Sequence, residues 1–182
     1  MVNRAEPVQN NKLATQIAIM DALAVDTTRL IVRLCSSNLG AEELLARING
    51  SKGKNIVAQL FDYGAVINST HLLGAYLNAV TAMDSGTCIS NSVSMEMLLF
   101  AAMTKQISDA IDRIGIKSGD KFVFFSNDMK TYNKFKEALK TDSELKTTRS
   151  HELAAASRLR VKLNGSASES VLQAMAMARL RD

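Results

Sequence analysis

The chain has 182 residues with a net charge of only +4, and 47% of the residues are hydrophobic, enough to build the core of one ordinary domain. Two cysteines, Cys35 and Cys88, exclude a disulfide framework and a cysteine zinc cluster. No apolar run approaches the roughly 18 residues that span a bilayer, and the polar start at residues 1–6 is unlike a signal peptide. We expect a reduced cytoplasmic protein, also nuclear if the source is eukaryotic.

The first part of the chain predicts alternating helices and strands. Residues 1–9 are read as a loose arm, followed by a helix over 10–24 with apolar residues at helical spacing. A β-branched run predicts a strand over 30–35, and residues 41–48 predict a short helix. A second strand is expected over 56–61, with an extension of the sheet at 65–67.

Residues 71–116 predict three helices with almost no loop between them. In the first, an apolar stripe places His71, Gly74, Asn78 and Thr81 on the opposite face, and Gly86 follows as a left-handed cap. Asn91 or Ser92 is expected to cap the second helix, which is apolar on most sides and therefore central in the core.

The third helix of this block is amphipathic. Its apolar stripe consists of Ile107, Ala110, Ile111 and Ile114, and Gly115 ends it. Its polar face, with Lys105 just before it, is left for solvent or a partner. Asp109 and Asp112 lie near Lys105 and Arg113, which indicates an ordinary ion-paired surface.

The last third of the chain predicts a third strand over 121–125, a helix over 129–140 and a final helix over 169–181. Residues 141–168 are poorly patterned. Strands interleave with helices and the helices then cluster, so we predict an α+β fold. We expect a two-layer domain, with a small β-sheet packed with a cluster of helices, that spans residues 1–182 as a single unit with 1–28 as an N-terminal extension.

Positive charge is concentrated between Lys130 and Lys162, where nine Lys or Arg residues face four Asp or Glu residues. Such a segment is typical of a nucleic-acid footprint, and equally of a solvated helix surface. The basic loop over 50–54 is not a phosphate loop, because Ile48 stands where its first glycine is required and Asn55 replaces the Ser or Thr. It remains a basic loop able to touch a nucleic-acid backbone.

Chemistry-bearing residues form no recognisable catalytic set. His71 and His151 are the two histidines, and neither has a cysteine or carboxylate partner set at ligand spacing. His71, at a helix start, is interpreted as a capping or surface residue. We predict that the protein is not an enzyme and carries neither a cofactor nor a metal.

The middle block resembles the CGI-121-like family, also known by its animal member TPRKB, whose members are the kinase-binding subunits of the KEOPS (EKC) complex. The resemblance rests on short motifs: His71-Leu72-Leu73, Asn91-Ser92 before Met95-Glu96-Met97-Leu98-Leu99, Lys105-Gln106-Ile107, Ala110-Ile111 and Ile114-Gly115, with Val171-Leu172, Met175-Ala176 and Leu180 in the closing helix. The family usually has Ser-Gly-x-Arg-Gln-Ile at residues 102–107, so Met103 replaces a glycine and Lys105 replaces an arginine. A bidentate guanidinium contact is thereby lost, while a positive charge is kept.

The resemblance implies a non-catalytic subunit that binds and regulates the complex's small kinase/ATPase directly, and the other KEOPS subunits through it. It also implies that the protein helps to recruit tRNA, by the 3′ CCA end, for threonylcarbamoyl-adenosine modification beside the anticodon. Combining it with the helix patterns, we expect the kinase to bind Ala75, Tyr76, Ala79, Ile107, Ala110 and Ile111. We expect tRNA to bind Lys54, Thr70, His71, Lys105, Gln106 and Arg113.

Two other functions remain open from the sequence. One is a stand-alone RNA-binding α+β module, which a titration of RNA with and without the kinase would distinguish. The other is a small enzyme with an unrecognised site, which would show turnover that a single point substitution abolishes.

Overall fold

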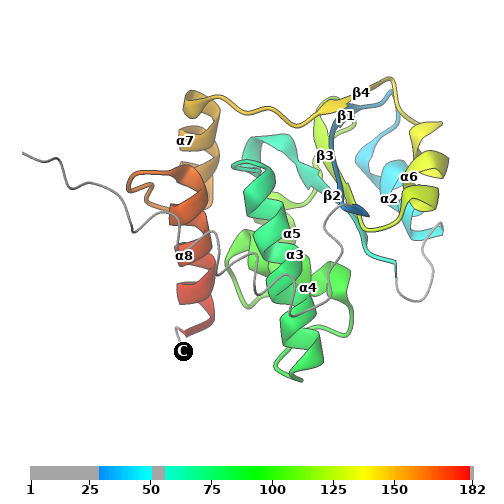
Figure 1. The fold of residues 1–182 in the computed structure, drawn as a ribbon. Coiled ribbons are helices and arrows are strands. Elements are labelled where there is room, and N and C mark those ends of the chain that lie inside the picture. The colour runs from blue at the N-terminus through cyan, green and yellow to red at the C-terminus, as the bar shows by residue number, and fades with distance from the viewer. Residues whose placement is uncertain (1–28, 51–55, 181–182) are drawn as a thin grey trace, which may run out of the picture.

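The computed structural model describes residues 29–50 and 56–180, and within them it contains seven α-helices and a four-stranded antiparallel sheet (Figure 1). The predicted α+β class is confirmed. The expected arm at 1–9, the expected helix at 10–24 and Lys54 lie outside the described residues.

The sheet has the strand order β2-β3-β1-β4, and every pair of neighbours is antiparallel. Its strands are β1 (Ile31–Ser36), β2 (Ala58–Asp62), β3 (Phe122–Ser126) and β4 (Thr141–Glu144). In the register, Leu34 of β1 and Phe61 of β2 both lie opposite Val123. Every residue of β3 is buried, which explains why its sequence is almost continuously apolar.

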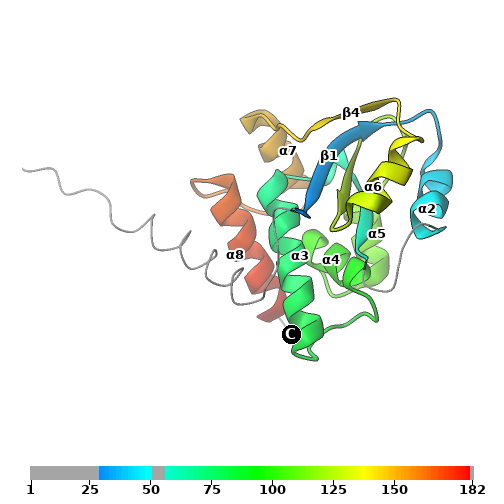
Figure 2. The same cartoon turned by 45° about the vertical axis from the view of Figure 1, so that its right-hand side comes forward.

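Helices cover both faces of the sheet (Figure 2). On one face, α2 (Ala41–Gly50) and α6 (Met129–Lys136) pack on Phe122 and Phe124. On the other, Val123 and Phe125 pack against the larger cluster, which is made of α3 (Ser69–Asp84), α4 (Val93–Ala102), α5 (Ile107–Ile114), α7 (Arg149–Arg158) and α8 (Ala167–Leu180). The expectation of two layers is therefore incomplete, because α2 and α6 add a third.

Two segments differ from the sequence prediction. Residues 65–67 do not extend the sheet, because the Asp62 carboxylate accepts a hydrogen bond from the Gly64 N–H and turns the chain into a 3-10 helix over Tyr63–Ala65. The poorly patterned stretch 141–168 contains β4 and α7. Most of β4 is exposed and polar, so it carries no apolar alternation that would indicate a strand.

The buried face of α3 also differs from the expected one. His71 and Gly74, assigned to the outward face, are both buried. A Cβ on Gly74 would lie 2.4 Å from Leu172 Cδ2 of α8, so any larger residue here would require the Leu172 side chain to move. Because α3 packs against α4 and α8 together, its buried surface is wider than one apolar stripe.

The ends of α3, α4 and α5 follow the sequence prediction. Gly86 has φ +69° after α3, the Ser92 hydroxyl accepts a hydrogen bond from Met95 N–H at the start of α4, and Gly115 ends α5. Glu96 has a further role, because its buried carboxylate accepts hydrogen bonds from the Ile89 and Ser90 N–H groups. It thus fixes the loop between α3 and α4.

Candidate functional site

Helix α5 has two different flanks beside its buried stripe. Ala110 and Ile114 are buried in the core, and the 100° turn per residue puts Ile107 and Ile111 on one flank and Asp109 and Arg113 on the other. Ile107 is 42% exposed and Ile111 is 45% exposed, and at i, i+4 spacing they form one apolar stripe on the surface. From here on, the name apolar stripe of α5 refers only to these two exposed side chains, Ile107 and Ile111.

Four of the six residues expected to face a kinase are in the core. Ala75, Ala79 and Ala110 are fully buried and Tyr76 is almost so, and Tyr76 stacks at a tilt on Phe125 of β3. Their placement on an exposed margin is wrong, because the small side chains of α3 and α5 face α4 rather than solvent. Of the expected set, the apolar stripe of α5 alone is exposed.

A groove lies between the α4–α5 segment on one side and α8 with the α7–α8 connection on the other. Its volume is about 920 Å³. Its walls contain Lys105, Gln106, Asp109 and Arg113 from the first side and Arg160, Lys162, Asn164 and Gln173 from the second. We call this the α5–α8 groove.

The charge of the α5–α8 groove is positive. Four cations, Lys105, Arg113, Arg160 and Lys162, line it together with one carboxylate, Asp109. Arg113 forms an ion pair with Asp109 at 2.5 Å, and the Thr104 hydroxyl donates to the same carboxylate at 3.0 Å. The polar lining and the excess of cations suit a phosphate backbone rather than an apolar ligand.

Of the residues expected to contact tRNA that the structure describes, three lie together in the groove, and Thr70 and His71 do not line it. Lys105, Gln106 and Arg113 all line the groove, whereas half-buried Thr70 lies in the first turn of α3 and is absent from the lining. Arg160 and Lys162 join them, although the sequence indicated only that the segment is basic. Their position depends on α7, which the sequence did not predict.

His71 is not a surface residue. Its Nδ1 accepts a hydrogen bond from Ile67 N–H at 3.2 Å, and its Nε2 lies 2.9 Å from the Ala101 carbonyl. Burial lowers the pKa of His71 to about 4, against the smaller raising effect of the Ala101 carbonyl, so the ring is neutral. With no exposed surface and both nitrogens occupied, the ring has no atom left for RNA.

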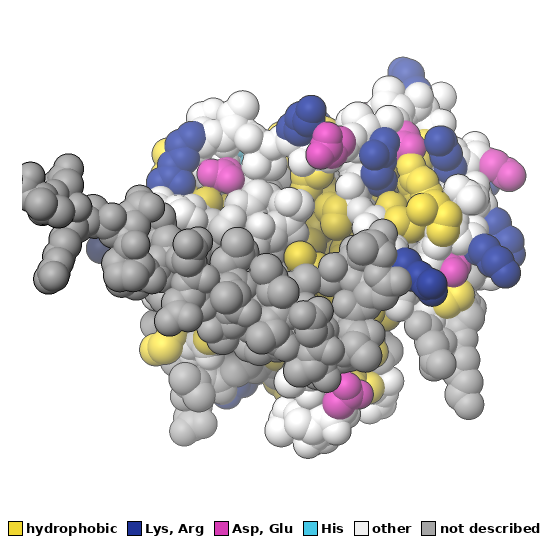
Figure 3. All heavy atoms as spheres, in the orientation of Figure 1, with side chains coloured by type: hydrophobic (Ala, Val, Ile, Leu, Met, Phe, Trp, Pro, Cys, Tyr) yellow, Lys and Arg dark blue, Asp and Glu magenta, His cyan; other side chains and the backbone are white. Residues whose placement is uncertain are grey.

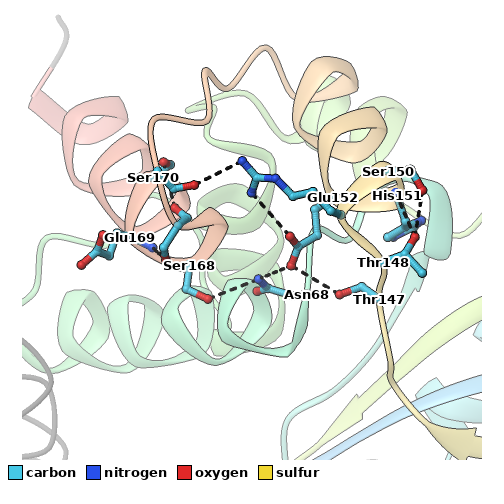
Figure 4. A network of polar contacts seen from close by, with 12 residues as sticks. Asn68, Thr147, Thr148, Ser150, His151, Glu152, Ser168, Glu169 and Ser170 are labelled. Carbon is cyan, nitrogen blue, oxygen red and sulfur yellow. Dashed lines mark hydrogen bonds and ion pairs between the residues drawn. The ribbon is translucent and has the colours of Figure 1, made fainter. Parts of the chain in front are cut away.

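A polar network fixes the far wall of the groove to the start of α3 (Figure 4). The Asn68 side-chain oxygen caps α3 by accepting from His71 N–H, and its amide donates to Glu152 of α7 at 3.1 Å and to Ser168 of α8 at 3.3 Å. Arg149 belongs to the same network, because it forms an ion pair with Glu152 at 3.7 Å and donates a hydrogen bond to the Gly165 carbonyl. The α7–α8 connection is thus held at both ends.

The basic segment 130–162 does not form one patch. Lys130, Lys134, Lys136 and Lys140 lie on or just after α6, at the end of the molecule where Figure 3 shows several Lys and Arg side chains. Arg160 and Lys162 follow directly after α7, and Figure 1 shows α7 at the end of the molecule opposite to α6. The groove therefore uses only the last part of this segment.

The charged cluster beside α6 ties the edge strand to the sheet. Asp142 of β4 pairs with Arg33 of β1 at 2.6 Å and accepts from the Tyr132 hydroxyl of α6. Desolvation raises the pKa of Asp142, but the hydrogen bonds from Tyr132 and Arg33 outweigh it, so the net shift is downward. Nearby, burial raises the pKa of the Cys35 thiol to about 12, which leaves it protonated and weakly nucleophilic.

Across residues 29–50 and 56–180, no three His, Cys, Asp or Glu side chains gather in a way that could hold a metal, and no helix has the length and hydropathy to cross a membrane. A family model described as kinase binding protein CGI-121 matches residues 37–178. Curated proteins provide no match to the chain.

Proposed function

Because the chain belongs to the CGI-121 family of kinase-binding proteins, we propose that it is a non-catalytic subunit of the KEOPS complex that binds and regulates the small kinase/ATPase of that complex. We further propose that it helps to recruit tRNA, by the 3′ CCA end, for threonylcarbamoyl-adenosine modification beside the anticodon. The family match supports kinase binding, and the α5–α8 groove supports the tRNA part of the proposal.

The apolar stripe of α5 is the surface that we assign to the kinase. Ile107 and Ile111 are exposed aliphatic side chains on a short helix whose other flank lines the groove. Aliphatic or aromatic anchors that become buried dominate protein interfaces. A stripe of two isoleucines with charged neighbours Asp112 and Lys117 fits such an anchor surrounded by a polar rim.

Capture of the native complex tests the assignment to KEOPS. The tagged full chain, expressed in its source cell, should co-purify with the KEOPS kinase and with the subunit that transfers the carbamoyl group. Recovery of the chain without either subunit would contradict membership of the complex.

The α5–α8 groove is the surface that we assign to tRNA. Protein–RNA recognition favours single strands, whose bases and phosphates are accessible, and the 3′ end of tRNA is single-stranded. Lys105, Arg113 and Lys162 supply cations from both walls. Contacts of this kind bind all tRNAs about equally, because phosphates carry no sequence information.

A pair of tRNAs, one intact and one trimmed of its terminal CCA, tests this role. The intact tRNA should bind more tightly to the full chain, and both affinities should fall with salt. Equal affinity for the two would remove the 3′-end role. Tight binding with the kinase absent and no capture of KEOPS subunits would instead favour a stand-alone RNA-binding module.

A further inference from the structure

Three helices of this chain end in the same hydrogen-bonding pattern. After α3, α4 and α7, two consecutive residues donate their N–H groups back to the helix, the first to the carbonyl three residues back and the second to the carbonyl five residues back. The pairs are Gly86 to Met83 and Thr87 to Ala82, Met103 to Phe100 and Thr104 to Leu99, and Arg160 to Ser157 and Val161 to Ala156. This is the Schellman motif, in which one residue adopts left-handed backbone angles. That residue is Gly86 after α3, Met103 after α4 and Arg160 after α7.

Only the first of these residues is of the type that the motif prefers. Glycine takes left-handed angles without steric cost, whereas a residue with a Cβ is strained there. Met103 has φ 53° and Arg160 has φ 60°, and they are the non-glycine residues with positive φ within 29–50 and 56–180. Both line the α5–α8 groove, whereas Gly86 does not.

Strained residues cluster at functional sites, where the side chain is needed in the position that the strain imposes. Met103 also packs against the core, which is a sufficient reason for its side chain. Arg160 is exposed, so packing does not explain why a residue other than glycine occupies this left-handed position. Arg160 lines the wall opposite Lys105 and Arg113, and a guanidinium binds phosphate through two parallel hydrogen bonds.

We propose that Arg160 contacts a phosphate of single-stranded RNA in the α5–α8 groove and holds the strand against Lys105 and Arg113. This rests on the proposed tRNA-binding function. The left-handed cap sets the position of Arg160, and the network of Asn68, Glu152 and Ser168 holds the wall that carries it.

The test compares Arg160→Gly and Arg160→Asn with the full chain, because both residues accept left-handed angles and neither is charged. Arg160→Gly should raise the melting temperature by relieving strain. It should also weaken intact tRNA about fivefold at 0.1 M salt and lower the slope of log K against log salt by roughly 0.7. Arg160→Asn should show the same loss of affinity and slope. Arg160→Lys should keep the slope.

Lys134→Ala is the matched control, because it removes one exposed positive charge from α6, at the other end of the molecule. It should leave the salt slope unchanged. A higher melting temperature with an unchanged slope in Arg160→Gly would overturn the proposal, as would a lower melting temperature in that variant. Failure of the unaltered chain to bind tRNA would refute the proposed tRNA function itself, and this inference with it.

Discussion

At the scale of single residues, the largest departure from the sequence prediction concerns His71. A histidine at a helix start indicated a capping or surface residue, yet the ring is buried with both nitrogens paired. The Nδ1 that accepts from Ile67 N–H has no room for a proton, so the structure requires the neutral ring. No pattern of neighbouring residues could indicate this, because Ala101 comes from α4, 30 residues away.

This environment predicts a pH-dependent stability. The pKa of His71 is about 4 in the fold and 6.5 ordinarily, so the unfolded chain binds more protons between these values. The stability from a neutral His71 is therefore complete above pH 6.5 and is lost as pH falls through 4, by about 3 kcal/mol in all.

Urea unfolding between pH 6.5 and 5 measures this loss, with His71→Gln as the comparison. The free energy of unfolding should fall more steeply with decreasing pH in the unaltered chain than in the variant, whatever their absolute stabilities. Other titrating groups are common to both proteins and cancel in the difference. Parallel pH profiles would show that His71 does not titrate in this window.

At the scale of elements, Asn68 joins three helices through one side chain. Its oxygen caps α3, and its amide donates to α7 and α8. Asn68→Asp keeps the capping oxygen but replaces the donor by a second carboxylate oxygen facing Glu152. We expect a loss of about 1–3 kcal/mol of stability in urea unfolding.

Glu152→Gln is the control for the hydrogen bond between Asn68 and Glu152. The double variant Asn68→Asp, Glu152→Gln should recover part of the loss, because the new amide can donate to Asp at position 68. Additive effects of the two substitutions would contradict a direct interaction between them.

Ala110 was predicted to lie on the kinase-binding surface, but it is fully buried. We therefore expect Ala110→Glu to lose cooperative unfolding in circular dichroism, because an unpaired charge would enter the core. Ile111→Glu, one residue later and exposed, should keep the helical signal. Equal stability of the two variants would contradict the orientation of α5.

The sequence could predict the elements that bury one face or all of their side chains. The apolar runs of β1 and β3, the hydroxyl cap at Ser92 and the left-handed glycine at Gly86 are local signals. Exposed, polar β4 is defined by pairing with β1, to which Asp142 is joined by Arg33, and no local signal carries that information. The same holds for the groove, where Lys105 and Arg160 line one hollow only because α8 packs on α3 and α4 and α7 packs on the 3-10 helix Tyr63–Ala65.

At the scale of the whole molecule, α5 separates the two proposed surfaces. The apolar stripe of α5 lies on one flank and the α5–α8 groove on the other, so a kinase and a tRNA can be bound side by side without sharing residues. Bound together, they would hold the 3′ end of the tRNA close to the kinase.

Direct titration of the purified KEOPS kinase with the full chain tests kinase binding through α5. Ile111→Glu should weaken the affinity by about 2 kcal/mol or more, since a charge would replace a central aliphatic anchor. Leu153→Glu is the matched control, because Leu153 is 50% exposed on α7, comparable to the 45% of Ile111, and is outside the proposed interface. Full affinity in Leu153→Glu with a large loss in Ile111→Glu is the predicted result. Undiminished binding by folded Ile111→Glu would contradict the account.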